Sequence, residues 1–293
     1  MGGRLSIVDI LLGLSVPLIW SMGIVFAKGA IESFPPILLM TLRFAVTALA
    51  LVWFVRPPMG QMGKFFVIAL ISAAIQYSLT FTGLVGIDAS VAALVVQLEV
   101  PFLVIIGALF LKEKTDPKKW VGILIAFVGV GLIAGEPKLG GAWLSLLMVT
   151  GGALAWSIGQ ALVRNLKDVS GMTVTAWVAV FATPQLLVMS LIFESGQLAA
   201  LKSANWVVWT SVLYLGLIMT VVGYGIWYSL VRKHPISLVA PFLLMLPVFS
   251  VIGAQVFLDE RLTPQIMIGG VLVIAGVAFI LIERPTRATA KPG

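Results

Sequence analysis

Cysteine is absent from the 293-residue sequence, and histidine occurs once, at His234. The lack of cysteine excludes disulfides and thiolate metal sites, and a lone histidine in a predicted loop does not make a metal centre, so we expect neither metal nor cofactor. Charged residues are also scarce, at 11% of the chain, whereas 60% is hydrophobic and the mean hydropathy is +1.10. A soluble domain of this composition would expose too much apolar surface to water, which indicates an integral membrane protein.

Long polar stretches are missing as well, so no segment is available for a soluble domain. Apolar runs of about 18–25 residues, the length that spans a bilayer, follow one another along the chain. They predict an all-α membrane protein with ten transmembrane helices near residues 7–27, 36–55, 64–85, 89–111, 119–135, 142–163, 172–193, 206–231, 236–258 and 264–282. The first run also has features of a cleavable signal peptide. Because the sixth carries the same motif deep in the chain, we expect the first to remain as a helix.

Basic residues are distributed unevenly between the two sides of these spans. Fourteen of the 19 lysines and arginines fall on one side, four on the other, and Arg43 lies within a span. Loops rich in lysine and arginine stay in the cytoplasm, so both termini are predicted to be cytoplasmic. The net charge of +7 is therefore attributed to helix orientation and contact with the lipid bilayer, and no nucleic acid is expected as a partner.

The second half of the sequence repeats the first. Residues 90–133 return as residues 237–280, and Glu113 matches Glu260 at the same offset (260 − 113 = 147). Pro101 matches Pro247 one residue closer (247 − 101 = 146). Each copy is an apolar segment, a charged turn and a second apolar segment with a stripe of glycines. This pattern predicts a helical hairpin of membrane-spanning length that occurs twice.

A shorter motif extends the repeat to the first helix of each half. Trp20-Ser21-x-Gly23 in the first span matches Trp156-Ser157-x-Gly159 in the sixth. Because each half holds an odd number of spans, the second half must enter the membrane the opposite way up. The sequence thus predicts a 5+5 inverted-topology repeat with units at 1–136 and 137–293, the architecture that many secondary transporters use for alternating access.

These motifs, with Thr41-Leu42-Arg43-Phe44 in the second span and the doubled Pro…Gly…Glu-Lys or Glu-Arg hairpins, resemble the drug/metabolite transporter superfamily, EamA type. Among its members the sequence is most similar to the YddG-type aromatic amino-acid exporters. The resemblance covers nearly the whole chain. It implies ten helices in two inverted halves, cytoplasmic termini, a central cavity, and export of small metabolites across a bacterial inner membrane.

Few ionisable or strongly polar side chains lie inside the predicted spans, and they are the first candidates for substrate contact because hydrocarbon does not tolerate them without a partner or a cavity. Arg43 and Glu99 are predicted at similar depth, with Gln97 and Gln160 as further polar groups. Two interpretations remain open for Arg43 and Glu99. They either form a structural ion pair or bind the carboxylate and ammonium of a substrate. If transport is coupled to protons, Glu99 is the leading carrier.

Aromatic residues form the second candidate group. Tyr77 lies in a four-residue stripe on the third span, and Tyr224 and Tyr228 lie in a similar stripe on the eighth. Trp20 and Trp156 are the matched tryptophans of the repeat, and Thr80 joins the candidate set. Such stripes are typical of helix packing. The alternative is that these stripes line a cavity. Aromatic walls suit either a planar apolar ligand or a cation, so both an aromatic amino-acid exporter and a cationic-drug exporter remain open.

The matched prolines Pro101 and Pro247 are predicted to bend the fourth and ninth spans and to serve as hinges, because proline removes a backbone hydrogen bond. The glycine stripes of the fifth and tenth spans predict close packing within the scaffold or a homodimer. The charged turns at 112–119 and 259–261 are interpreted as solvated caps. An intramembrane enzyme is the rival from another class, and it lacks a nucleophile with a base, a metal cluster or a second carboxylate beside Glu99.

Overall fold

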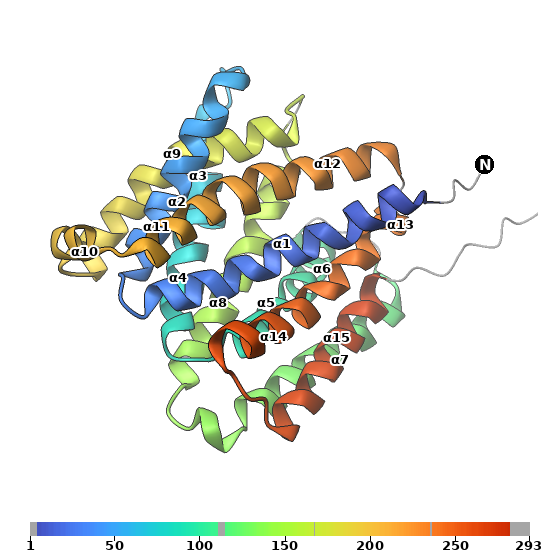
Figure 1. Ribbon diagram of the computed structural model, residues 1–293. Helices are drawn as coiled ribbons and strands as arrows, with labels where there is room; N and C mark the ends of the chain where they lie inside the picture. The colour runs from blue at the N-terminus through green and yellow to red at the C-terminus, as the bar shows by residue number, and fades with distance from the viewer. Residues whose placement is uncertain (1–4, 111–114, 167, 235, 282–293) are drawn as a thin grey trace, which may run out of the picture.

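The computed structural model describes residues 5–110, 115–166, 168–234 and 236–281. Within these ranges the chain is helical without a β-strand, and ten helices are long and apolar enough to cross a membrane (Figure 1). The ten-span prediction is confirmed. The observed spans are Ile7–Ile31, Pro36–Phe54, Met62–Val85, Ala89–Phe110, Pro117–Ala134, Trp143–Val163, Gly171–Phe193, Trp206–Lys233, Pro241–Leu258 and Pro264–Leu281.

Five spans are each one α-helix: α1 (Ile7–Ile31), α7 (Pro117–Ala134), α8 (Trp143–Val163), α9 (Gly171–Phe193) and α15 (Pro264–Leu281). The second span is α2 (Pro36–Leu51) followed by a 3₁₀ turn, η1 (Val52–Phe54). Short elements outside the spans are η3 (Pro137–Leu139) and α10 (Gln197–Ser203). The remaining four spans are interrupted, and the interruptions occur in matched pairs.

The third and eighth spans each contain a π-helix. The third is α3 (Met62–Ala69), η2 (Leu70–Ile75) and α4 (Gln76–Val85), and the eighth is α11 (Trp206–Leu213), η4 (Tyr214–Val222) and α12 (Gly223–Lys233). The π-helix η2 corresponds in the repeat to the second part of η4. A π-helix widens the turn and shifts the direction of the side chains that follow, and such segments often lie at functional sites. Here they precede Tyr77 and Tyr224.

The fourth and ninth spans change conformation just before their matched prolines. The fourth is α5 (Ala89–Val96) and α6 (Glu99–Phe110), separated by a turn, and Pro101 lies in the first turn of α6. The ninth is α13 (Ile236–Val239), the 3₁₀ segment η5 (Ala240–Leu244) and α14 (Met245–Leu258), with Pro247 in the first turn of α14. Each break falls where the proline ring would crowd the carbonyl four residues earlier. The breaks predicted for these spans are therefore present, while the hinge role remains a proposal.

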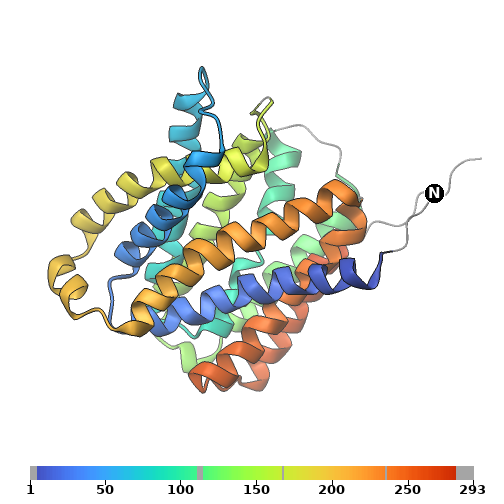
Figure 2. The same ribbon diagram turned by 45° about the horizontal axis from the view of Figure 1, so that its top comes forward.

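Helix packing follows the inverted repeat. The counterpart spans α2 and α9 pack against each other, as do α7 and α15 (Figures 1 and 2). Other contacts are exchanged between the halves: α1 packs on α14 and α12, and their counterparts α8, α6 and α4 pack in the same combination. This pairing is what two halves related by a two-fold axis in the membrane plane produce.

The α7–α15 contact shows the symmetry at atomic detail. A Cβ atom on Gly129 would lie 2.6 Å from the carbonyl oxygen of Gly269, and one on Gly269 would lie 2.7 Å from that of Gly129. Gly122 and Gly276 make the equivalent close approach. Small residues let the two backbones meet, as expected for helices in lipid. The glycine stripes are thus buried between two helices of the same chain, where they serve scaffold packing.

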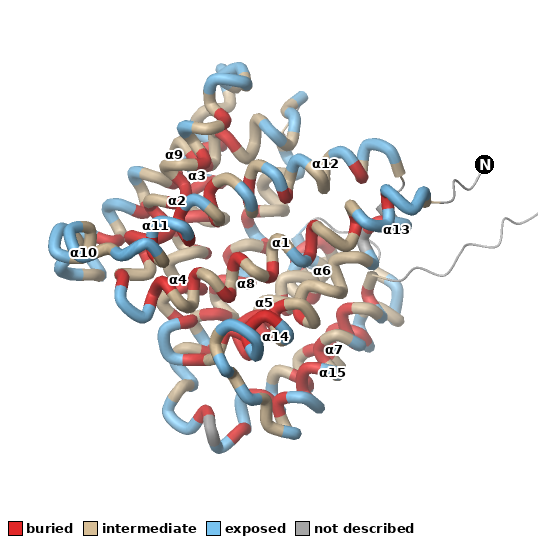
Figure 3. Tube along the Cα trace, viewed as in Figure 1, coloured by how far each residue is buried: buried red, intermediate tan, exposed pale blue. Residues whose placement is uncertain are grey.

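The two ends of the bundle differ in how tightly they are closed. We call the end that holds Ile7 and Leu281 the terminal face, and the end that holds Ile31 and Ala89 the far face. At the far face a continuous core includes Ile31, Phe34 and Ile87, each 7% exposed or less. Buried residues lie where helices meet, and many outward apolar side chains are exposed, as a lipid-facing surface requires (Figure 3).

Candidate functional site

A cavity of about 250 Å³ lies between the two halves and is lined by spans one to four, six and eight to ten. Its lining includes Leu281, at the terminal-face end of α15, and Leu243 of η5. Toward the far face it stops at Phe81 and Ala93, each four residues inside a helix end. At 1.5 Å per residue that leaves a seal about 6 Å thick. The cavity is therefore directed toward the terminal face.

Most of the residues predicted for the site line this cavity: Trp20, Arg43, Tyr77, Thr80, Gln97, Glu99, Trp156 and Tyr224. Two predicted residues do not. Gln160 lies one turn beyond Trp156 and outside the lining, and Tyr228 lies in a separate small crevice with Thr175, whose Oγ1 is 3.5 Å from the tyrosine hydroxyl. Both side chains fall outside because the helical stripe continues past the end of the cavity.

Arg43 is 1% exposed, and its guanidinium lies 4.6 Å from the ring centroid of Tyr77 and 5.3 Å from that of Phe44. Its Nη2 donates a long hydrogen bond of 3.4 Å to Thr220 Oγ1, and its Nε has no hydrogen-bond partner. Contacts with ring faces stabilise a cation by about 0.5–2 kcal/mol, which does not replace an anionic partner. A buried guanidinium with free donors is suited to receive an anion.

Glu99 is the first residue of α6 and lines the same cavity as Arg43. Its backbone carbonyl accepts a hydrogen bond from Ser157 Oγ at 2.8 Å. Among the described residues, no hydrogen bond or ion pair engages its carboxyl group, and Arg43 in particular is not paired with it. Of the two interpretations, the structural ion pair is not formed in this structure. The two side chains instead line one cavity separately.

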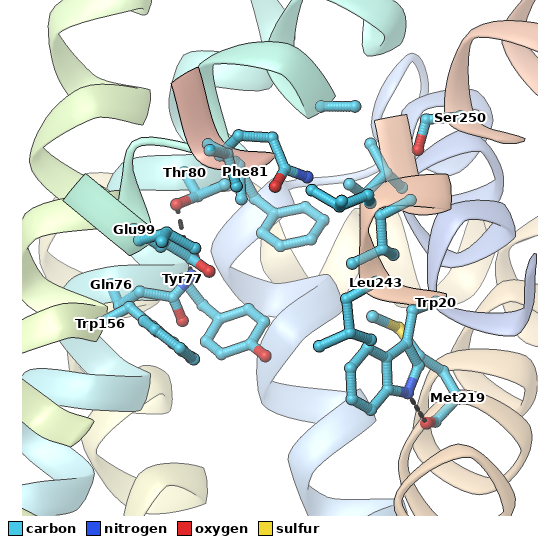
Figure 4. Close-up of a pocket in the computed structure, with 18 of the residues that line it drawn as sticks. Trp20, Gln76, Tyr77, Thr80, Phe81, Glu99, Trp156, Met219, Leu243 and Ser250 are labelled. Carbon is cyan, nitrogen blue, oxygen red and sulfur yellow. Dashed lines mark hydrogen bonds between the residues drawn. The ribbon is translucent and has the colours of Figure 1, made fainter. Parts of the chain in front are cut away.

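Gln76, Thr80 and Trp156 lie around Glu99 on one wall (Figure 4). The Nε2 of Gln76 donates to Thr80 Oγ1 at 3.4 Å, and its Oε1 is buried without a partner. Buried polar atoms normally find a partner, so an orphan beside a cavity marks a place for a ligand or water. This wall therefore offers a carboxylate and an amide oxygen, both of which accept hydrogen bonds from an ammonium group.

The other wall is apolar and aromatic. Trp20 and Leu243 lie there, across the cavity from Glu99 (Figure 4). The rings of Trp20 and Tyr224 are 4.9 Å apart between centroids, and Trp20 Nε1 donates to the carbonyl of Met219 at 3.1 Å, which fixes the indole. Met219 lies in the π-helix η4. Tyr77 and Phe81 stack at 5.7 Å with planes 12° apart.

The serines of the repeated Trp-Ser-x-Gly motif have a role that sequence reasoning missed. Besides the carbonyl four residues earlier in its own helix, each hydroxyl shares its proton with an acceptor in the other half: the Leu246 carbonyl for Ser21 and the Glu99 carbonyl for Ser157, both at 2.8 Å. Each acceptor lies just before the proline of a span in the other half. The hydroxyls thus tie the first and sixth spans to the interrupted helices of the other half, next to the adjacent tryptophans. The repetition of the motif was the signal for this role.

Ser250 is a further lining residue that the sequence did not single out. It is 1% exposed, and its hydroxyl has no hydrogen-bond partner. The carbonyl one turn earlier, that of Leu246, is already bonded by Ser21. A single serine in an apolar span carries no pattern, and its unpaired state depends on a contact between distant helices.

Residues 8–135 and 143–282 both match the model of the EamA-like transporter family. A protein of Escherichia coli (strain K12) named "Probable amino-acid metabolite efflux pump" is 29% identical over 97% of this chain and 98% of its own length. A Salmonella typhimurium protein of the same name is 29% identical with the same coverage. The Bacillus subtilis "Uncharacterized transporter YoaV" is 27% identical over 92% of this chain and 96% of its own. A solved crystal structure with 20% identity covers 93% of this chain and 96% of that one at a TM-score of 0.62, which shows a shared fold.

Proposed function

Because the chain belongs to the EamA-like transporter family, we propose that this multi-pass membrane protein exports amino acids or closely related metabolites by alternating access. The names of the Escherichia coli and Salmonella relatives support an amino-acid metabolite as the cargo. We further propose an apolar or aromatic side chain on that cargo and a bacterial inner-membrane location. With cytoplasmic termini, the cavity faces the cytoplasm, which is the state in which an exporter loads.

The observation that carries this proposal is that Arg43 and Glu99 line one cavity without pairing with each other. An amino acid supplies the two missing partners. Its carboxylate accepts a bidentate pair of hydrogen bonds from the Arg43 guanidinium, and its ammonium donates to Glu99 and to Oε1 of Gln76. Hydrogen bonds to charged groups contribute about 1.5–3 kcal/mol each.

The side chain of the cargo is placed against the second wall. Trp20, Tyr224 and Leu243 form a surface that suits an apolar or aromatic group, and stacking adds about 0.5–1.5 kcal/mol per ring pair beyond burial. The Trp20 indole is held by its hydrogen bond to Met219 and so presents a fixed surface. An aliphatic side chain fits the same wall with less stacking energy, so affinity should follow aromatic content.

A cationic drug is the second candidate, because Glu99 and the ring faces both attract cations. Arg43 opposes it. A quaternary amine without a carboxylate would share the cavity with a buried guanidinium that has gained no anion. The geometry therefore favours the zwitterion.

The test is uptake into proteoliposomes of the purified protein, with aromatic amino acids, aliphatic amino acids and quaternary amines, each with and without a proton gradient. We expect aromatic amino acids to be transported, aliphatic ones less so, and quaternary amines not at all. Transport of quaternary amines without transport of any amino acid would overturn the proposal. Dependence on the proton gradient would show that transport is coupled to protons.

A further inference from the structure

The seal over the cavity at the far face is the turn between α4 and α5. Phe81 and Ala93 are the cavity-lining residues nearest that face, and the turn that joins their helices runs from Val85 to Ala89. Ile87 in this turn is 3% exposed and belongs to the far-face core. The contacts that fix this turn therefore determine whether the cavity is closed at the far face.

Lys28 of α1 binds one side of the turn. Its Nζ donates to the carbonyls of Leu84 at 2.8 Å, Ile87 at 2.9 Å and Val85 at 3.2 Å. The last carbonyls of a helix have no partner within the helix, and they carry the negative end of its dipole. Lys28 therefore caps the C-terminus of α4 with a full positive charge from another span.

Glu260, which follows α14, binds the other side. Its Oε1 accepts from the backbone N–H of Ala89 at 2.6 Å, and its Oε2 accepts from the N–H of Ser90 at 3.0 Å and from the Ser90 hydroxyl at 2.6 Å. The interpretation of this charged turn as a solvated cap is wrong for Glu260, whose carboxylate caps α5, whereas Asp259 and Arg261 are exposed. The other charged turn, at 112–119, lies partly outside the described residues.

The local backbone fits this arrangement. Asp88 is the N-cap residue of α5, yet its side chain makes no capping hydrogen bond, so Glu260 takes that role from a distance of 171 residues. Asp259 adopts φ 53° and ψ 26°, a left-handed conformation that is unfavourable for residues other than glycine and asparagine-like ones. Aspartate tolerates this conformation, and the turn that it makes at the end of α14 places the Glu260 carboxylate on α5.

We propose that Lys28 and Glu260 form a far-face latch, and that release of Glu260 from Ala89 and Ser90 is the step that opens the cavity to the far face. This proposal rests on the alternating access proposed above. The latch joins α5 to α14, which are the far-face parts of the counterpart spans four and nine. At the terminal face, the corresponding parts of these spans are α6 and η5, and they pack on different helices. The helix α6 packs on α7, α8 and α15, whereas η5 packs on α1, α13, α14 and α15.

If the two faces exchange conformations during transport, α5 and α14 must separate in the same way. The hydrogen bonds of the latch cross the α5–α14 contact and would have to break.

A second carboxylate at the same face provides a matched control. Glu194 accepts from the N–H groups of Ile37 at 2.7 Å and Leu38 at 3.0 Å, and so caps α2 from the end of α9. The chemistry is the same, since a loop glutamate caps a helix of the other half. However, α9 contributes no residue to the cavity lining, and its contact with α2 does not cover the cavity. Loss of this cap should weaken the scaffold without opening the far face.

The absence of native cysteine allows a direct accessibility test. Ala93→Cys places one thiol under the seal, and a membrane-impermeant thiol reagent is applied from the far face or from the terminal face, in intact cells and in inverted vesicles. Glu260→Gln is then added to this background. Its amide NH₂ would face the N–H donors of α5, so the latch loses its charge and at least one acceptor.

We expect Glu260→Gln to raise the far-face labelling rate at least about tenfold, since one hydrogen bond to a charged group corresponds to about a factor of ten in an equilibrium. Ser90→Ala, which removes one of the three bonds, should give a smaller increase, and Glu194→Gln none. Equal far-face labelling for Glu260→Gln and Glu194→Gln would overturn the latch. The assay uses no substrate, so it stands apart from the uptake test. As a folding control, each variant must elute as a monodisperse species in size-exclusion chromatography and must label from the terminal face. A variant that fails either control is misfolded.

Discussion

Arg43→Gln is the substitution that separates a binding role from a structural one. In the proposed complex the guanidinium gives two charge-assisted hydrogen bonds to the cargo carboxylate, each worth about 1.5–3 kcal/mol. Taking the low value for both, the loss is about 3 kcal/mol, or about a 100-fold weaker Kd. Arg43→Lys keeps the charge and loses the planar fork, so we expect about a tenfold effect.

The effect of Arg43→Gln on the stability of the folded protein should be small. Among the described residues the Arg43 side chain has no ion-pair partner, and it contributes a 3.4 Å hydrogen bond to Thr220 Oγ1, a 3.9 Å contact with Met40 Sδ and two ring contacts. The stabilisation of about 0.5–2 kcal/mol from the rings is offset by removal of a buried charge. We therefore expect the unfolding temperature of the Arg43→Gln protein to stay within about 4 °C of wild type.

The assay is equilibrium binding of phenylalanine and of phenylalanine amide, which has no carboxylate, to the purified protein. Wild type should bind the amide about 100-fold more weakly, and Arg43→Gln should bind the two compounds alike. Arg56→Gln, in an exposed loop, is the control and should behave as wild type. The reasoning is refuted if Arg43→Gln weakens binding of both compounds by the same factor, or if it lowers the unfolding temperature by much more than about 4 °C and leaves both affinities unchanged.

Three further predictions concern the cavity and the scaffold. Glu99→Gln should abolish any dependence of uptake on a proton gradient while exchange of substrate continues, and an unchanged dependence would remove Glu99 from the coupling role. Gly129→Ala should lower the unfolding temperature, because its Cβ would lie 2.6 Å from the Gly269 carbonyl oxygen, whereas Gly131→Ala, which meets nothing within 4 Å, should be tolerated; equal effects of the two would contradict this packing. Ser21→Ala removes the hydrogen bond between α1 and the Leu246 carbonyl and should cost about 0.5–1.5 kcal/mol in the free energy of unfolding, while Ser15→Ala, whose hydroxyl bonds only within its own helix, should cost less; the reverse order in thermal denaturation would refute the anchoring role.

Hydropathy predicted the ten spans, and the sequence repeat predicted how the two halves are oriented relative to each other. A span must supply about 20 apolar residues, and an odd number of spans per half forces inversion. The predicted ends of most spans agree with the structure to within two residues, as at Pro36 and Val85. The glycine stripes around Gly129 and Gly276 predicted close helix packing, although only the structure shows that α7 and α15 of the same chain are the two partners.

The details of the site were less predictable, since they depend on contacts between residues distant in sequence. Nothing in the apolar run around Tyr214 indicates a π-helix, and nothing in the turn at Glu260 indicates that it caps α5 from the other half. The tyrosine stripe predicted Tyr224 in the cavity and also Tyr228, because periodicity does not show where the cavity ends. The polarity of Arg43 and Glu99 predicted that both residues lie at the site, but only the packing of the helices shows that they are not paired.

Counterflow of labelled phenylalanine in proteoliposomes tests most directly whether the cavity between the inverted halves carries an amino acid from one face to the other. Vesicles loaded with unlabelled phenylalanine should accumulate the labelled compound transiently above equilibrium, because a carrier that exposes its cavity to one face at a time exchanges outgoing for incoming substrate. No such overshoot should occur with a quaternary amine inside and outside. An overshoot with the quaternary amine and none with phenylalanine would contradict the account.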